Sequence, residues 1–499
     1  MDVSRHESLM LLRFIRSDNN KTIFATVIIA AFLVIVWRYL DWPIGSGFTP
    51  DSAGYIGMSP YRQPLYGLWA NSAYSLLGTW NYVIRAQVIL FIAATALLMW
   101  ELCRQSIWGI LATFLLFGFI ALMTRFGMMS LVGSLITEGL FYTLIILFAY
   151  CLMLWIRSEY ALIPAGMICL ILVLMTQLRP AAILVLALPF AAAIYSFLRP
   201  SNGVRGRITT IIIPLSLFVF LVAIVPLLVG KRFLQVGTSA DSMGFVLLPR
   251  ISLLEPPEDI KMALPLWNEL SASWRKVSEQ LSIDALTQFD AQLQEAIRYE
   301  LGPKVLIPAL RSDNSVGVHF DWSSAIDNTF AKAIALRWIK NDFMQFLQVS
   351  AAHYWGTLTG SNYMGSNNRR ETWSAINKVD DRTWKLAKLR TDYPNNKIFE
   401  PLKTGTEIIY FGIRIFSTGI LFLGVISAVW LVLRSAEIKI VHPAAIACAA
   451  GAGWCLLHSM PAGLLVFPEF RYVYGNLLMY GAAAAVAMAY IGYPRIPHA

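Results

Sequence analysis

The sequence predicts an all-α polytopic membrane protein with about ten transmembrane helices and one large extracytoplasmic, α-rich loop domain. Three observations support this fold class. Of the 499 residues, 57% are hydrophobic and only 14% are charged, whereas soluble domains carry about 25% charged residues. The mean hydropathy is +0.58. The apolar residues are also gathered in uncharged runs of about 20 residues, the length that crosses a bilayer as a helix.

Ten of these uncharged apolar runs are candidate spans. They cover approximately residues 22–40, 84–102, 107–124, 134–156, 160–177, 180–198, 208–229, 408–433, 442–463 and 472–492. The fifth and sixth runs together are nearly twice the ~20 residues that one crossing needs, so we interpret them as two spans, with one broken helix as the alternative. The first run follows a polar, basic segment and is expected to act as an uncleaved signal-anchor.

The distribution of Lys and Arg in the short loops predicts the orientation. With the N-terminus inside, 12 of the 19 Lys and Arg residues outside segment 231–406 lie on the cytoplasmic side, Arg104 and Arg157 among them. We therefore expect a multi-pass protein of the cell inner (cytoplasmic) membrane with both termini in the cytoplasm. This topology accounts for most of the net charge of +10, so nucleic acid is not expected as a partner.

The spans divide the chain into three parts. Residues 1–230 form an N-terminal transmembrane module with a first outer loop at 41–82, and residues 407–499 form the C-terminal transmembrane helices. Between them, segment 231–406 holds 21 Lys and Arg against 19 Asp and Glu. This balance favours a folded extracytoplasmic (periplasmic) domain over a linker, and the periodic stretch 326–356 predicts a helix within it.

The cysteines and carboxylates give no metal motif. All five cysteines fall in or beside apolar runs, where buried thiols are more expected than a disulfide framework or a zinc site. No clustered carboxylate set such as D-x-D stands out either. The sequence therefore predicts no metal site, and it leaves a divalent metal requirement open.

Charged residues at membrane depth are costly and often functional, and in this chain they gather on one predicted side. Asp51 and Arg62 lie in the first outer loop, and Glu138 opens the fourth span from the outer face. Arg179 lies at the outer junction of the fifth and sixth spans, and Arg471 precedes the tenth span. This convergence on the outer face is the main functional signal in the sequence.

Each of these charged residues also has a purely structural interpretation. Asp51 follows Pro50 and suits a helix N-cap. The three arginines suit interfacial or snorkelling positions, and Glu138 has the alternative of pairing with one of them. The candidates for contact with a substrate, all on the predicted outer side, are Tyr55, Tyr66, His353 and Tyr472.

Short motifs surround the charged residues. They read Tyr61-Arg62-Gln63-Pro64, Thr137-Glu138-Gly139-Leu140-Phe141, Leu178-Arg179-Pro180 and Glu469-Phe470-Arg471-Tyr472. With Asp51 in the first outer loop, their order and common side resemble the GT-C membrane glycosyltransferases, which include the protein O-mannosyltransferase and lipid A aminoarabinose transferase relatives. The resemblance covers most of residues 1–230 and the last two spans. The Asp-Glu pair of the protein mannosyltransferases is absent, because Ser52 follows Asp51.

The resemblance implies a GT-C-like fold and an enzyme that takes one sugar from a polyprenyl-phosphate donor, with no other certain cofactor. The acceptor is expected to be a hydroxyl of an envelope glycan, lipid or protein on the extracytoplasmic face, and a single displacement would invert the anomeric centre. Such a transfer needs a base and positive charge for the departing phosphate. Asp51 is the candidate base and Glu138 the second catalytic candidate, and Arg62, Arg179 and Arg471 are the candidates for the phosphate.

Two other functions stay open at this point. An O-antigen ligase or polymerase also has many spans and a large outer loop, and its catalysis would depend on loop residues such as His353 and the Arg369-Arg370 pair. A lipid or sugar transporter would need paired charges near the middle of its spans, and the span centres here are almost free of charge. Whether Asp51 or His353 is essential separates the first alternative from the transferase.

Overall fold

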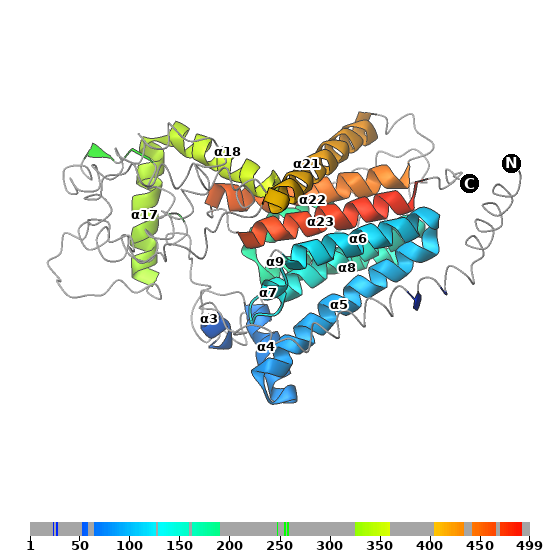
Figure 1. Ribbon diagram of the computed structural model, residues 1–499. Coiled ribbons are helices and arrows are strands. Elements are labelled where there is room, and N and C mark those ends of the chain that lie inside the picture. The colour runs from blue at the N-terminus through cyan, green and yellow to red at the C-terminus, as the bar shows by residue number, and fades with distance from the viewer. Residues whose placement is uncertain are drawn as a thin grey trace, which may run out of the picture. The chain divides into compact units, whose positions relative to one another are not determined.

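The computed structural model describes residues 52–57, 64–125, 128–158, 162–189, 325–359, 404–433, 442–465 and 470–491, together with residues 23, 26, 27, 247, 254, 255, 257 and 258. Every regular element in these ranges is a helix (Figure 1). The prediction of an all-helical fold is therefore confirmed for the part of the chain that the structure describes. Contacts divide the described elements into two units.

The first unit is a bundle of helices. It holds α3 (Ser52–Ile56), α4 (Pro64–Leu77), α5 (Trp80–Gln105), α6 (Ile107–Arg125), α7 (Met128–Val132), α8 (Glu138–Arg157), α9 (Leu162–Leu178) and the 3₁₀ helix η1 (Pro180–Leu186). It also holds residues 417–433 of α21 (Thr404–Leu433), 443–458 of α22 (Pro443–Leu465) and 474–489 of α23 (Phe470–Ala489).

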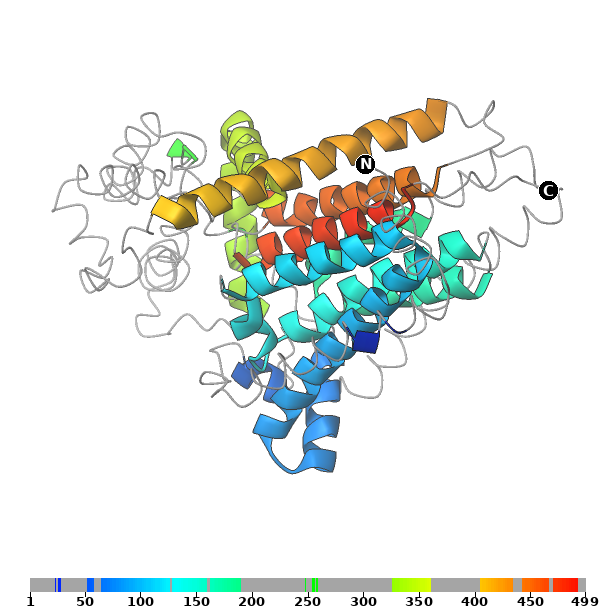
Figure 2. The same ribbon diagram turned by 45° about the vertical axis from the view of Figure 1, so that its right-hand side comes forward.

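Close contacts at glycines show which of the C-terminal helices in this unit are neighbours. A Cβ atom at Gly481 of α23 would come within 2.7 Å of the Phe119 ring of α6, and one at Gly451 of α22 would overlap Ala483 of α23. Gly424 of α21 is equally close to α22. Small residues let membrane helices approach closely. The spans α21, α22, α23 and α6 therefore lie side by side in that order (Figures 1 and 2).

The helices α4 and α5 form a hairpin whose turn is set by Gly78. This glycine has φ of 78°, in the left-handed region that glycine adopts without strain. Its N–H donates to the carbonyl oxygen of Tyr74 at 2.8 Å, which ends α4. Thr79 then caps α5 by accepting from the backbone N–H of Tyr82. The hairpin lays α4, with Tyr66, against the first turns of α5.

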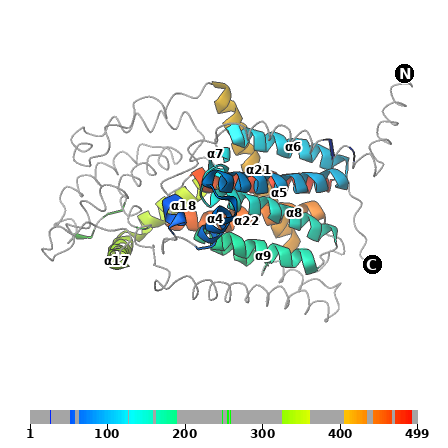
Figure 3. The same ribbon diagram turned by 90° about the horizontal axis from the view of Figure 1, so that it is seen from below.

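Five of the described helices are long and apolar enough to cross a membrane. They are Trp80–Gln105, Glu138–Arg157, Phe411–Leu431, Pro443–Pro461 and Tyr472–Ala489. Many large apolar side chains on the bundle are exposed, such as Leu97, Phe114 and Phe422. Lipid accommodates such a surface and water does not. Seen from below, α5, α6, α8 and α9 run along a common direction (Figure 3). The chain is thus a multi-pass helical membrane protein.

The ten predicted spans match the structure in part. Five coincide with the long helices, and spans 107–124 and 160–177 coincide with two shorter apolar helices. Spans 22–40 and 208–229 lie almost entirely outside the described residues, as does the second half of 180–198. The count of ten therefore stays a prediction.

The helix α9 ends at the junction that the sequence left open. Arg179 is extended, with φ of −141° and ψ of 113°, and η1 begins at Pro180. Proline has no N–H to continue the hydrogen-bond ladder of the preceding helix, so the chain breaks there. Helix α9 and η1 are therefore separate elements, which agrees both with two spans and with one broken helix.

The second unit includes α17 (Ala325–Asn341), α18 (Phe343–Thr359) and residues 404–416 of α21. The predicted helix 326–356 is present, but it is divided at Asp342, whose carboxylate accepts from the backbone N–H of Glu255 at 2.9 Å. The rest of the predicted loop domain 231–406 lies outside the described residues, apart from a few single positions.

Candidate functional site

Glu138 and Arg179 form a buried ion pair at one end of the first unit. The Nη2 atom of Arg179 lies 3.4 Å from Oε1 of Glu138, and the two side chains are 7% and 0% exposed. The hydroxyl of Thr137 donates to Oε2 of Glu138 at 3.2 Å. Removing one partner of a buried pair costs about 3–5 kcal/mol because the other charge is left uncompensated. Each of the two side chains therefore compensates the buried charge of the other.

The local sequence places both charges at helix ends. Helix α7 stops at Val132, the chain turns over residues 133–137, and Glu138 is the first residue of α8. Arg179 directly follows the last residue of α9. A carboxylate at a helix N-terminus and a guanidinium at a helix C-terminus both interact favourably with the helix dipole. The pair thus joins the start of α8 to the end of α9.

A stack of aromatic side chains packs against the guanidinium of Arg179. Its guanidinium carbon lies 5.4 Å from the centre of the Phe141 ring. Phe141 is stacked on His458 with ring centres 5.4 Å apart, and His458 is stacked on Trp454 at 4.6 Å. His458 Nδ1 and Asn476 Oδ1 share a hydrogen bond of 3.0 Å. Residues of α8, α22 and α23 therefore line one side of the ion pair.

Gln87 joins three segments on the other side of the site. Its Oε1 atom accepts from the Tyr66 hydroxyl at 2.9 Å. Its Nε2 atom donates to the carbonyl oxygens of Val132 at 2.7 Å and Ser134 at 3.0 Å. A Cβ atom at position 139 would overlap the Gln87 amide, so Gly139 leaves the space that this amide fills. Gln87 thus fixes the turn that leads into Glu138.

Helix α3, in the predicted first outer loop, is attached to the same turn. The Ser52 hydroxyl donates to the carbonyl oxygen of Leu135 at 2.9 Å. The ring of Tyr55 makes an edge contact with Tyr66, with centres 4.9 Å apart. Burial, and next the negative charge of Glu138, raise the pKa of Tyr66 well above its ordinary value. Tyr66 therefore stays a protonated hydrogen-bond donor.

The other predicted site residues lie outside the described residues or in the second unit. Asp51 and Arg62 lie outside the described residues, although Ser52, next to Asp51, is held against the turn before Glu138. Arg471 is in α23, but its side chain is outside the described part. His353 is buried in α18 and Tyr472 in α23, and both belong to the second unit.

Three polar residues of the site are not predicted from the sequence. Gln87 and Asn476 stand alone in apolar runs, and His458 has no acidic or histidine partner at ligand spacing. The signal that would have found them is an uncharged polar residue inside an otherwise apolar span. Such a residue needs a hydrogen-bond partner in lipid.

No group of three or more His, Cys, Asp or Glu that could hold a metal ion occurs among the residues that the structure describes. All five cysteines are free, four of them buried and Cys448 half-buried. Comparison with models of known families, with curated proteins and with solved structures found no match to this chain.

Proposed function

We propose that this protein is a membrane glycosyltransferase that moves a single sugar from a polyprenyl-phosphate donor to an acceptor hydroxyl of an envelope glycan, lipid or protein. The observation that carries the proposal is the buried Glu138–Arg179 pair, located at the end of the bundle where α3 and Tyr66 also lie. A guanidinium keeps its charge in apolar surroundings and offers forked donors that suit a phosphate. The enclosed position strengthens its attraction for an anion.

The proposed reaction is a single displacement. The acceptor oxygen forms a bond to the anomeric carbon of the sugar, and the bond from that carbon to the phosphate oxygen breaks. The electron pair of the broken bond stays with the polyprenyl phosphate, whose charge Arg179 stabilises together with Arg62 and Arg471. The acceptor proton passes to the carboxylate of Asp51. The product sugar has the inverted configuration.

In this proposal Glu138 acts by holding Arg179. A lone arginine at membrane depth would be drawn to the water interface. The carboxylate of Glu138 and the ring of Phe141 instead keep the guanidinium at the buried junction of α9 and η1. The prenyl chain would lie between spans, and the sugar would face the extracytoplasmic side. Tyr55 and Tyr66, whose rings contact each other beside the turn before Glu138, are the candidates for contact with the sugar.

The test is sugar transfer by the purified protein in proteoliposomes, with mass analysis of lipid-linked sugars from cells with and without the gene to name the donor. Arg179→Lys keeps the charge, and with it the partner of Glu138, but it loses the forked donors. We expect donor affinity to fall about tenfold or more, the scale of one charge-assisted hydrogen bond. Asp51→Asn should abolish transfer while donor binding stays near that of the wild type.

Asp41→Asn is the matched control, because Asp41 is a second carboxylate of the first outer loop at the end of the first predicted span. It should transfer sugar at the wild-type rate. Wild-type turnover by Asp51→Asn, or unchanged donor affinity in Arg179→Lys, would contradict the proposal. Loss of activity on changing His353 or Arg369 alone would favour a ligase, and movement of lipid-linked sugar across the bilayer without transfer would favour a transporter.

A further inference from the structure

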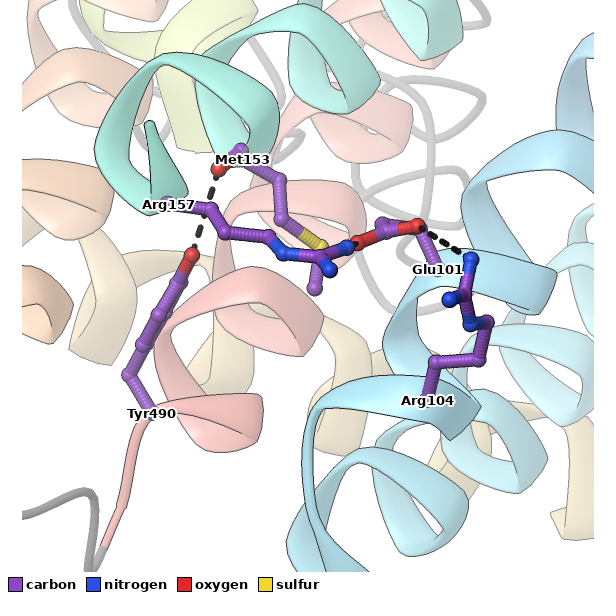
Figure 4. A network of polar contacts seen from close by, with 5 residues as sticks. All are labelled: Glu101, Arg104, Met153, Arg157 and Tyr490. Atoms are coloured by element: carbon purple, nitrogen blue, oxygen red, sulfur yellow. Dashed lines mark hydrogen bonds and ion pairs between the residues drawn. The ribbon is translucent and has the colours of Figure 1, made fainter. Parts of the chain in front are cut away.

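Three charged side chains form a second cluster in the first unit, at the end of the bundle opposite to Glu138. Glu101 and Arg104 come from the last turns of α5, and Arg157 is the last residue of α8 (Figure 4). Nη1 of Arg157 donates to Oε1 of Glu101, and Nη1 of Arg104 lies 4.0 Å from Oε2. We call these three residues the Glu101 cluster.

The Glu101 cluster carries an excess positive charge that faces outward. The carboxylate is 5% exposed, whereas each arginine side chain is 45% exposed. One carboxylate neutralises one of the two guanidinium groups, so the cluster keeps a net charge of about +1. Within the described part of the chain, Glu101 at 4.0 Å is the only partner of Arg104. Most of the N–H donors of the Arg104 guanidinium are therefore available to bind a ligand.

Hydrogen bonds fix the ends of the helices that carry the two arginines. The Tyr490 hydroxyl donates to the carbonyl oxygen of Met153 at 3.2 Å, one turn before Arg157 (Figure 4). The Ser106 hydroxyl, two residues after Arg104, donates to the carbonyl oxygen of Ala489 at 2.7 Å. These bonds join the ends of α5, α8 and α23. The backbone positions from which the two arginine side chains extend are thus fixed relative to each other.

The surroundings of the Glu101 cluster match the boundary between headgroups and acyl chains. It lies at the ends of two helices that are apolar enough to cross a membrane. At the same end of the bundle, Ile107 and Trp108 are 39% and 43% exposed. Tryptophan is enriched at this level of the bilayer. A ligand here would meet two guanidinium groups and an apolar surface together.

We propose that the Glu101 cluster binds the phosphate group of an anionic phospholipid. Arginine pairs bind phosphate oxygens through parallel N–H donors, and basic pockets between membrane helices bind lipid headgroups. A phospholipid satisfies both parts of the surface, because its phosphate meets Arg104 and Arg157 while its acyl chains cover the exposed apolar side chains. The site lies at the end of the bundle away from the Glu138–Arg179 pair, and it does not depend on the proposed glycosyl transfer.

The test is lipid binding to the full-length protein in detergent, measured by native mass spectrometry with phosphatidylglycerol and with phosphatidylcholine. Arg104→Gln removes one phosphate contact and leaves the Glu101–Arg157 pair intact, so the fold is retained. We expect the affinity for phosphatidylglycerol to fall about tenfold, the scale of one charge-assisted hydrogen bond. Phosphatidylcholine should bind weakly to both proteins.

Arg85→Gln is the matched control. Arg85 is an exposed arginine at the other end of the same helix, next to the Tyr82 ring at 5.9 Å, and its loss should leave lipid binding unchanged. Glu101→Gln removes the competing carboxylate and should tighten binding of phosphatidylglycerol, whereas a merely structural ion pair would give no tightening.

Two results would overturn the proposal. One is equal affinity of the wild type and Arg104→Gln for phosphatidylglycerol, with no tightening in Glu101→Gln. The other is full competition by inorganic phosphate at the same concentration as the lipid, which would show a site for free phosphate in place of a lipid site.

Discussion

The side chain of Gln87 connects three segments that are far apart in the sequence. It accepts from Tyr66 of α4 and donates to the carbonyl oxygens of Val132 and Ser134, which precede α8. Gln87 is fully buried on a helix that is apolar enough to cross a membrane. A buried polar group without partners is costly, so these three bonds are needed together. The position of Glu138 therefore depends on an uncharged residue of another helix.

Replacement of Gln87 by Leu should destabilise the protein strongly. The change leaves the Tyr66 hydroxyl and two carbonyl groups without this partner, at a cost of roughly 1–3 kcal/mol for each group that stays unsatisfied. We expect a clear drop in the thermal unfolding midpoint in detergent. Thr95→Val on the same helix is the control, because among the described residues the buried Thr95 hydroxyl bonds only to the carbonyl oxygen of Phe91 in its own helix. Equal midpoints for the two variants would contradict the role given to Gln87.

At the scale of residues, the sequence predicted Glu138 and Arg179, and it did not predict the uncharged residues around them. Glu138 and Arg179 stand out because a charge in an apolar run is rare, and the structure brings the two together. Gln87, His458 and Asn476 carry no charge, and their partners lie 18 to 47 residues away along the chain. Packing of the bundle selects those partners, and packing is not visible in a local pattern.

Glycines control how closely the spans approach at the scale of helices. In the pair α6 and α23, a Cβ atom at Gly481 would lie 2.7 Å from Cδ1 and 2.9 Å from Cε1 of Phe119. A larger residue at position 481 would therefore displace the Phe119 ring or separate the two helices.

Gly481→Ala should lower the thermal unfolding midpoint of the purified protein. Overpacking of this kind costs typically about 1–3 kcal/mol. Gly118→Ala on α6 is the control, since no atom of the residues that the structure describes lies within 4 Å of a Cβ atom there. Alanine gains up to about 1 kcal/mol over glycine in a helix, so Gly118→Ala should be neutral or slightly stabilising. If the two alanine variants unfold at the same temperature, the close contact with Phe119 does not limit stability.

Helix type was predictable, whereas helix boundaries depended on single residues. Seven predicted spans coincide with observed helices because an apolar run of this length has few other solutions in lipid. The break at Asp342 within the predicted helix 326–356 was not visible in the sequence, and the Asp342 carboxylate accepts there from the N–H of Glu255, 87 residues away. Pro180 did mark the end of α9, because the restriction it imposes is local.

The first unit has two chemically different ends. Glu138 and Arg179 form a neutral, buried pair at one end, and the Glu101 cluster at the other end is half-exposed and positive. The basic residues Arg104 and Arg157 were assigned to one side of the membrane from loop charges alone, and the structure places them together. The common end of α5 and α8 that carries these two residues was therefore predicted correctly. The side that faces the cytoplasm stays a prediction.

Cysteine labelling of intact cells can determine that side. Ser75 at the end of α4 and Ser158 after α8 are exposed and lie at opposite ends of the bundle. With an impermeant maleimide, we expect Ser75→Cys to react in intact cells and Ser158→Cys only after permeabilisation. The wild type should react little, because four native thiols are buried and Cys448 is half-buried. The reverse labelling pattern would show that the predicted orientation is wrong.

The ion pair at the junction of α9 and η1 also affects how the chain folds while the ribosome synthesises it. Arg179 is made 41 residues after Glu138 (179 − 138). At about 5–20 residues per second, this interval is roughly 2–8 seconds. During that time the helix that begins at Glu138 exists without its counter-ion. Because the carboxylate is the first residue of α8, it can remain in water at the membrane surface until Arg179 leaves the ribosome, and only then does the end of the bundle close over both.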